Sequence, residues 1–148
     1  MFMKHFIVTR FNLKVDQWKT SKNGTLVLTE KWLEERFELF ESYCLPSVIN
    51  QKNKEFYWLI YLDIDTPDKF RQRIKKNISN YPNFISLYID GIKSLHNSFN
   101  QNIVENLNDH DDFIITTRLD NDDSIHKNFI DTIQKLAIKK HETVIDLR

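Results

Sequence analysis

Glycine is scarce in this chain, whose 148 residues include only Gly24 and Gly91. Loops that hold phosphate on backbone N–H groups, such as the P-loop and the dinucleotide-binding turn, need several glycines within a few residues. The sequence therefore excludes both kinds of loop. A protein of this composition that binds a diphosphate would hold it with a metal ion and carboxylates instead.

Cysteine and long apolar runs are also missing. Cys44 is the single cysteine, which excludes an internal disulfide, and no group of Cys or His residues has the spacing of a zinc site. Residues 1–10 lack the apolar core of a secretory signal, and no apolar run approaches the roughly 18 residues of a membrane span. We therefore expect a cytoplasmic protein without a membrane span.

Neither sign of charge is in excess, because 21 Lys and Arg residues stand against 21 Asp and Glu residues. No global basic field points to nucleic acid or to an anionic membrane, and we expect no nucleic-acid partner. The hydrophobic content of 41% and the aromatic content of 13% are high enough to build a core. We expect residues 1–148 to form one domain.

Apolar runs that predict strands alternate along the chain with amphipathic stretches that predict helices. Strands are expected at residues 5–9, 56–62, 84–89, 113–117 and 143–147. Helices are expected at residues 29–44, 46–51, 69–78, 98–107 and 124–140, and a loop at residues 13–29. This alternation predicts an α/β fold with a mostly parallel sheet and flanking helices.

Polar side chains follow three of the predicted strands. The first strand ends in Thr9-Arg10-Phe11-Asn12, the second in Asp63 and Asp65, and the fourth runs into Arg118. Because ligands bind at the carboxyl ends of the strands in open parallel sheets, we expect these residues to share one functional edge. The alternative for any one segment is that its acids stop the strand and cap the next helix.

The segment after Arg118 is densely acidic. Asp120, Asp122 and Asp123 lie within four residues and repel one another unless a cation neutralises them. Mg²⁺ and Mn²⁺ take oxygen ligands and often complete their coordination with substrate phosphates. The pattern predicts a divalent metal site. The alternative is that Asp123 and Ser124 cap the helix that follows.

These motifs together resemble a known group of enzymes. The run Asp120-Asn121-Asp122-Asp123 after an apolar strand resembles the Asp-x-Asp signature of glycosyltransferases with the GT-A fold. Residues 44–51 and 56–63 are similar to a helix and the second strand of family 2 glycosyltransferases. The ordered set resembles the rhamnosyltransferase family over nearly the whole chain. The segments that carry this resemblance are Thr9-Arg10-Phe11-Asn12, Trp32-Leu33-Glu34-Glu35-Arg36-Phe37, Leu45-Pro46-Ser47, Gln51 and Arg118-Leu119-Asp120-Asn121-Asp122-Asp123.

The resemblance implies a GT-A (nucleotide-diphospho-sugar transferase) fold that is incomplete at its C-terminal end, so that this chain is the N-terminal donor-binding portion of a longer enzyme. It implies metal-dependent transfer of a sugar from a nucleotide-sugar donor to a saccharide or another hydroxyl acceptor, with Mn²⁺ or Mg²⁺ as cofactor. The implied donor residues are Thr9, Arg10, Asn12, Asp63, Asp65 and Asp120, and the implied metal ligands are Asp120, Asp122 and Asp123. We add Arg118 to the donor set, because a guanidinium matches phosphate and carboxylate geometry.

No catalytic base is assigned. Family members carry the base that deprotonates the acceptor well after the Asp-x-Asp motif, and this sequence ends soon after Asp123. Two other functions stay open. The chain could be a nucleotide-binding fragment without catalysis. It could also be a phosphatase of the haloacid-dehalogenase type, with Asp63 as nucleophile and Asp65 as acid and base, although Pro67 and the lack of glycine leave no obvious flap.

Overall fold

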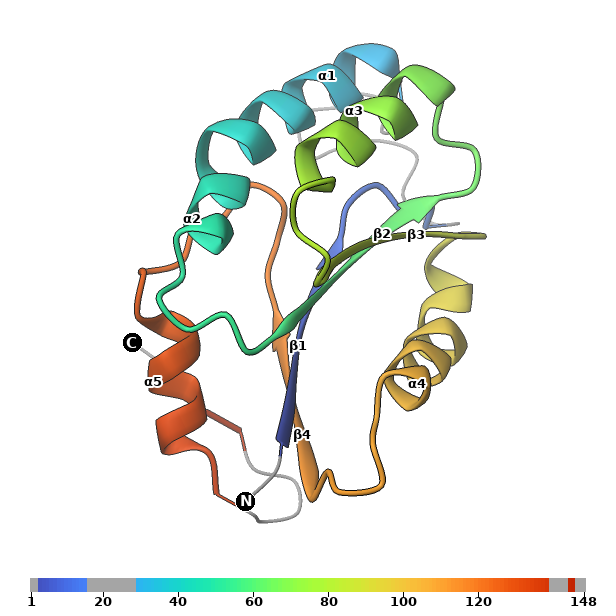
Figure 1. Ribbon diagram of the computed structural model, residues 1–148. Helices are drawn as coiled ribbons and strands as arrows, with labels where there is room; N and C mark the ends of the chain where they lie inside the picture. The colour runs from blue at the N-terminus through green and yellow to red at the C-terminus, as the bar shows by residue number, and fades with distance from the viewer. Residues whose placement is uncertain (1–2, 16–28, 139–143, 146–148) are drawn as a thin grey trace.

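The protein is a four-stranded, all-parallel sheet with helices on both faces, as seen in a computed structural model (Figure 1). The structure describes residues 3–15, 29–138 and 144–145. The strands are β1 (Met3–Arg10), β2 (Tyr57–Asp63), β3 (Phe84–Ile89) and β4 (Phe113–Arg118), in the order β3-β2-β1-β4. This architecture confirms the predicted α/β class and is consistent with a GT-A-like arrangement.

The helices divide between the two faces of the sheet. They are α1 (Glu30–Leu39), α2 (Leu45–Ile49), α3 (Asp68–Ile78), α4 (Leu95–Glu105) and α5 (Phe129–Leu136), with a π-helical segment at Phe40–Cys44 and a 3₁₀ turn at Ile92–Ser94. Buried side chains of α1, α2, α3 and α5 pack on one face, and Ile103 of α4 packs on the other. No helix among the described segments has the length and apolar character needed to cross a bilayer.

Aromatic rings fill the larger of the two cores. Phe37 of α1 stacks on Phe70 of α3 with ring centroids 5.4 Å apart, and Phe11 lies 4.7 Å from Phe37. On the opposite face, Tyr61 is fully buried, and its hydroxyl donates to Asn102 Oδ1 of α4 at 2.9 Å. Strand β2 lies between these two cores and is therefore apolar on both faces. This explains why β2 appears in the sequence as a continuous apolar run.

The helical stretch before β2 follows the sequence prediction with one addition. Thr29 caps α1 by accepting from Trp32 N at 3.2 Å, and Pro46 lies in the first turn of α2. Between the two helices the backbone widens into the π-helical segment, where Leu45 N–H bonds to Phe40 O. Proline has no N–H for the regular ladder, and its ring crowds the preceding turn, so a wider turn accommodates it.

The predicted helix at residues 124–140 is wrong at its beginning. Helix α5 starts only at Phe129 and ends at Leu136, after which Ala137 is extended. The N–H of Ile125 is instead bonded to Ser47 Oγ at 3.2 Å, and the carbonyl of His126 accepts from Gln51 at 2.8 Å. Contacts to Ser47 of α2 and to Gln51 therefore hold this segment outside the helix, and Ser124 does not cap it.

Three other predicted elements differ from the structure or lie mainly outside the described residues. Helix α4 begins at Leu95, three residues earlier than predicted, after a 3₁₀ turn. The predicted strand at residues 143–147 falls mostly outside the described residues, and its described part, Val144 and Ile145, is not in a strand. The predicted loop at residues 13–29 also lies mainly outside the described residues.

Candidate functional site

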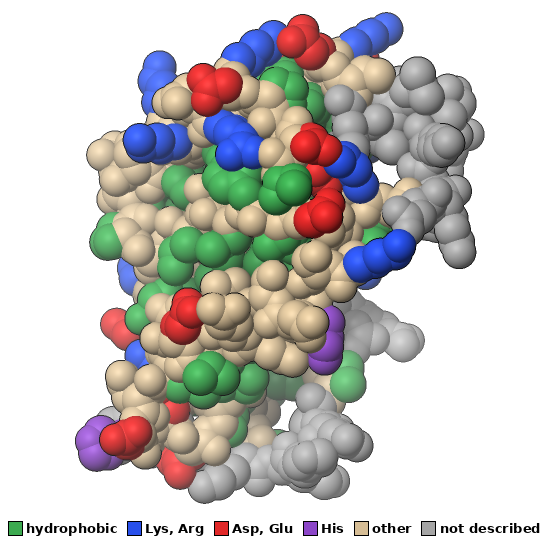
Figure 2. Space-filling model, turned by 90° about the vertical axis from the view of Figure 1, so that its right-hand side faces the viewer, with side chains coloured by type: hydrophobic (Ala, Val, Ile, Leu, Met, Phe, Trp, Pro, Cys, Tyr) green, Lys and Arg blue, Asp and Glu red, His purple; other side chains and the backbone are tan. Residues whose placement is uncertain are grey.

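The parallel sheet brings the predicted site residues to one edge. Strand β1 lies between β2 and β4, so the acids after β2 and the acids after β4 flank the end of β1 on opposite sides. Seen from the side of α4, charged side chains of both signs gather at the end of the molecule where the strands finish (Figure 2). The edge therefore combines two acidic groups with the end of the central strand β1.

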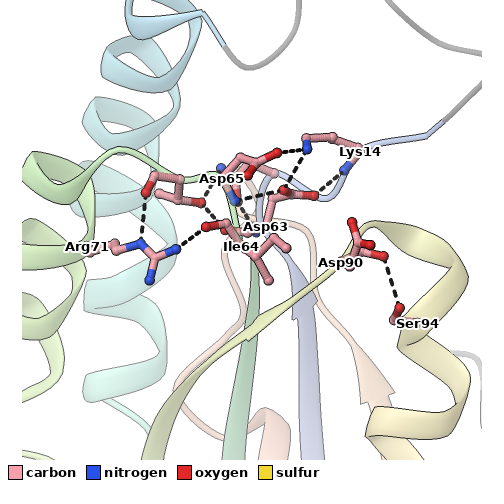
Figure 3. A network of polar contacts seen from close by, with 9 residues as sticks. Lys14, Asp63, Ile64, Asp65, Arg71, Asp90 and Ser94 are labelled. Carbon is pink, nitrogen blue, oxygen red and sulfur yellow. Dashed lines mark hydrogen bonds and ion pairs between the residues drawn. The ribbon is translucent and has the colours of Figure 1, made fainter.

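Asp63 is the buried centre of the first group (Figure 3). Its side chain is only 1% exposed. It accepts from Lys14 N at 3.1 Å and from Asp65 N at 3.0 Å, and Lys14 Nζ lies 3.4 Å from Oδ1. Lys14 Nζ also pairs with Asp65. The charge of this buried carboxylate is therefore balanced within the protein by a lysine that follows β1.

Lys14 is itself fixed from the other side, at the end of β3. Its carbonyl accepts from Ile92 N at 2.9 Å. Gly91 precedes this contact with φ +67°, and a Cβ at Gly91 would lie 3.1 Å from Lys14 O. Glycine is required here both by the left-handed backbone and by the close approach. The segment after β1 is thus clamped between the ends of β2 and β3.

The predicted donor residues of β1 differ in what they contact. Thr9 is fully buried and accepts from Trp58 Nε1 at 2.8 Å. Asn12 is buried, with Oδ1 accepting from Asp63 N at 3.1 Å and Nδ2 donating to Thr66 Oγ1 at 3.0 Å. Arg10 is half-buried and makes no hydrogen bond or ion pair with another described residue. Thr9 and Asn12 therefore shape the edge from within, while the Arg10 guanidinium has no bond to the described part of the chain. The contacts of all three residues with a nucleotide stay predictions.

The second group is the acidic turn, defined here as residues 120–123. Arg118 Nε lies 3.2 Å from Asp120 Oδ1, and Arg36 of α1 donates from Nη1 to Asp122 Oδ2 at 2.7 Å. Asp123 N closes the turn on Asp120 O at 3.2 Å. Two arginines from different parts of the chain thus offset part of the repulsion that the sequence predicts among these carboxylates.

Cys44 lies beneath this turn. The thiol is fully buried and donates to Asp120 O at 3.6 Å. Burial, followed by the charges of Asp123, Asp122 and Asp120, raises the pKa of Cys44 to about 12. The thiol therefore stays protonated near neutral pH, which excludes a nucleophilic role for it.

Asn121 is the site residue that sequence reasoning missed. It stands at the middle position of the Asp-x-Asp pattern, where the motif specifies nothing. The structure buries Asn121, and its Nδ2 donates to Phe11 O at 2.9 Å. This bond fastens the acidic turn to the end of β1. The only signal in the sequence was an amide placed among acids, which does not by itself predict burial.

Ser47 and Gln51, which belong to the segments that carry the family resemblance, hold the backbone of the chain that follows the acidic turn. Gln51 is buried, its Nε2 donates to His126 O at 2.8 Å, and its Oε1 accepts from Ile130 N at 3.0 Å. Ser47 Oγ accepts from Ile125 N at 3.2 Å. Ser47 lies in α2 and Gln51 follows its C-terminal end, and both side chains fix the chain that follows the acidic turn. They position the turn through its backbone.

The chemistry of the acidic turn suits a hard divalent cation, because its donors are carboxylate oxygens. Within the described residues, however, no group of three or more His, Cys, Asp or Glu side chains is arranged to hold a metal. Asp120 and Asp122 are each turned toward an arginine instead. The metal assignment therefore stays a prediction. The alternative that Asp123 and Ser124 cap a helix is wrong, since α5 begins at Phe129.

The surroundings of Asp63 do not favour the phosphatase alternative. A nucleophilic carboxylate must present an oxygen to the phosphorus atom. Asp63 is buried, with Oδ2 bonded to Lys14 N and Oδ1 bonded to Asp65 N. Both carboxylate oxygens of Asp63 therefore already accept hydrogen bonds from the protein backbone.

A groove of about 470 Å³ runs between β4 and α5. Its lining includes Ile114 and Ile115 from the strand and Ile133 from the helix. Of the predicted site residues, the groove touches Arg118 alone. It is therefore distinct from the edge that carries the carboxylates.

Three comparisons with known proteins test which family the chain belongs to. A search of curated proteins and a search of solved structures found no significant match. The sequence model of the family described as "Putative rhamnosyl transferase" matches residues 4–145. This range contains the ends of all four strands, the acidic turn, Ser47 and Gln51. Because the match covers nearly the whole chain, the protein belongs to the "Putative rhamnosyl transferase" family and, with it, to the glycosyltransferases.

Proposed function

We propose that the carboxyl edge of the sheet binds a nucleotide-diphospho-sugar together with Mn²⁺ or Mg²⁺, and that the protein transfers the sugar to a saccharide or another hydroxyl acceptor. The observation that carries this proposal is the placement of the acidic turn. Three carboxylates lie on a turn that is fastened to the end of β1 by Asn121 and to Cys44 by its backbone. A fixed set of oxygen donors beside the central strand end suits a metal–diphosphate complex.

The residues of the edge divide into two tasks under this proposal. Asp120 and Asp122, with Asp123, would hold the cation, which when bound would neutralise the negative charge that develops on the leaving diphosphate. Arg10 and Arg118 supply guanidinium groups suited to phosphate oxygens. The Asp63 group, held rigid by Lys14, forms the wall on the other side of β1, where the nucleoside would lie.

A second function uses the same site without turnover. A chain that binds the donor and the metal but transfers nothing would show the same binding behaviour. Release of the nucleoside diphosphate from a nucleotide-sugar in the presence of an acceptor distinguishes the two functions. Binding without release favours the non-catalytic alternative.

Calorimetry tests the binding site directly. UDP, GDP and dTDP are titrated into the native chain with and without Mn²⁺, and the titration is repeated with Asp122→Ala. Asp131→Ala is the matched control, because it also removes a carboxylate from an ion pair, with Lys135 on α5. We expect Mn²⁺-dependent binding that Asp122→Ala loses and Asp131→Ala keeps. Binding that is independent of the metal and indifferent to Asp122 would contradict the proposal.

A further inference from the structure

The ion pair between Arg36 and Asp122 joins two parts of the chain that are 86 positions apart. Arg36 stands in the last turn of α1, and its guanidinium lies 5.3 Å from the ring centre of Trp32. Its Nη1 donates to Asp122 Oδ2 at 2.7 Å. In this structure, one of the two oxygens of a proposed metal ligand is thus occupied by an internal cation.

The contact has the features of an exchangeable pair. The Arg36 side chain is 30% exposed and the Asp122 side chain 41% exposed, and one nitrogen makes the bond. Arg73 on α3 shows what a fixed arginine looks like in this protein, since its Nε and Nη2 both bond Glu41 at 2.8 Å and its Nη1 bonds Glu34 at 2.5 Å. A single, partly solvated contact is far weaker than a bidentate one.

Charge balance indicates when the exchange would occur. The net charge of this group is −1, from the three carboxylates of the acidic turn and the guanidiniums of Arg36 and Arg118. A divalent cation alone would make this group positive, and both arginines would repel it. A diphosphate brings at least two negative charges and restores the balance. Binding of the metal is therefore favoured when the diphosphate arrives with it.

We propose that Arg36 is a displaceable counter-ion of Asp122, which makes metal binding depend on the donor. In the donor-free protein the guanidinium occupies Asp122, and the cation that enters with the diphosphate takes its place. The guanidinium already lies over the Trp32 ring, 5.3 Å from its centre, and we expect it to keep this contact when it leaves Asp122. Arg36 acts through Asp122 and is a positioning residue. This inference rests on the proposed function.

Titration of Mn²⁺ without nucleotide measures the role of Arg36. We expect Arg36→Gln to bind Mn²⁺ alone about three- to tenfold more tightly than the wild type, because the competing cation is gone. The ratio of Mn²⁺ affinities with and without the nucleoside diphosphate should fall by a similar factor. Arg36→Lys keeps the positive charge and should keep the weak binding of the wild type. A gain in affinity cannot arise from partial unfolding of the variant.

Lys135→Gln is the matched control, since it removes a cation from the ion pair with Asp131 on α5. It should leave both Mn²⁺ affinities unchanged. If the wild type binds Mn²⁺ through Asp122 and Arg36→Gln binds it equally or less tightly, the role of Arg36 is refuted while the proposed function stands. If Mn²⁺ and diphosphate do not bind in an Asp122-dependent way, the proposed function fails, and the role of Arg36 fails with it.

Discussion

The buried imidazole of His5 should make the stability of this fold depend on pH. His5 is 1% exposed, its Nε2 lies 2.8 Å from Thr117 Oγ1 of β4, and Gln134 Nε2 of α5 lies 3.5 Å from its Nδ1. The Gln134 amide is oriented by Asn53 Nδ2, which donates to Oε1 at 3.0 Å. This hydrogen-bond network assigns Nδ1 as the acceptor and Nε2 as the donor to Thr117. A second ring proton would face an N–H group.

Burial lowers the pKa of His5 from 6.5 to about 4. Between these values the unfolded chain binds a proton and the folded protein does not. The contribution of His5 to stability is therefore complete above pH 6.5 and is lost as the pH falls toward 4. The loss relative to pH 7 works out to about 2 kcal/mol at pH 5 and approaches about 3 kcal/mol below pH 4.

Urea denaturation of the wild type and of His5→Gln at pH 7 and pH 5 measures this effect. All other titrating groups are common to both proteins, so the difference between their pH dependences isolates His5. We expect the free energy of unfolding to fall between pH 7 and pH 5 by about 2 kcal/mol more in the wild type than in the variant. Parallel behaviour of the two proteins, within about 0.5 kcal/mol, would refute the reasoning.

Two further substitutions test the contacts that hold the candidate edge. Gly91→Ala forces a side chain onto a left-handed residue and against Lys14 O, and it should lower the free energy of unfolding in urea by about 1–2 kcal/mol; unchanged stability would mean that the clamp on Lys14 is not tight. Asn121→Ala removes the bond to Phe11 O and should cost about 1–3 kcal/mol in the same assay. It should also weaken Mn²⁺-dependent binding of a nucleoside diphosphate in calorimetry, and full binding would count against the fastening role of Asn121.

Local sequence patterns were sufficient for most of the framework. A continuous apolar run predicted β2, because a strand that is buried on both faces has no solvent side to alternate with. Thr29 was recognised as the cap of α1 because a capping hydroxyl acts within three residues. The start of α5 was not predictable in this way. Contacts of Ser47 and Gln51, 78 and 79 positions from their partners Ile125 and Ile130, decide it.

The candidate site, like the framework, was predicted from the sequence only in part. The sequence by itself determined that acids follow β2 and β4, that a parallel sheet gathers them at one edge, and that the chain belongs to a glycosyltransferase family. Only the tertiary structure decided which cation balances which carboxylate, with Lys14 on Asp63 and Arg36 on Asp122. The physical reason is that Coulomb attraction depends on distance in space. For Lys14 and Asp63 that distance is set by the pairing of β1 with β2, and for Arg36 and Asp122 by how α1 packs over the sheet. A linear pattern of charges contains neither distance.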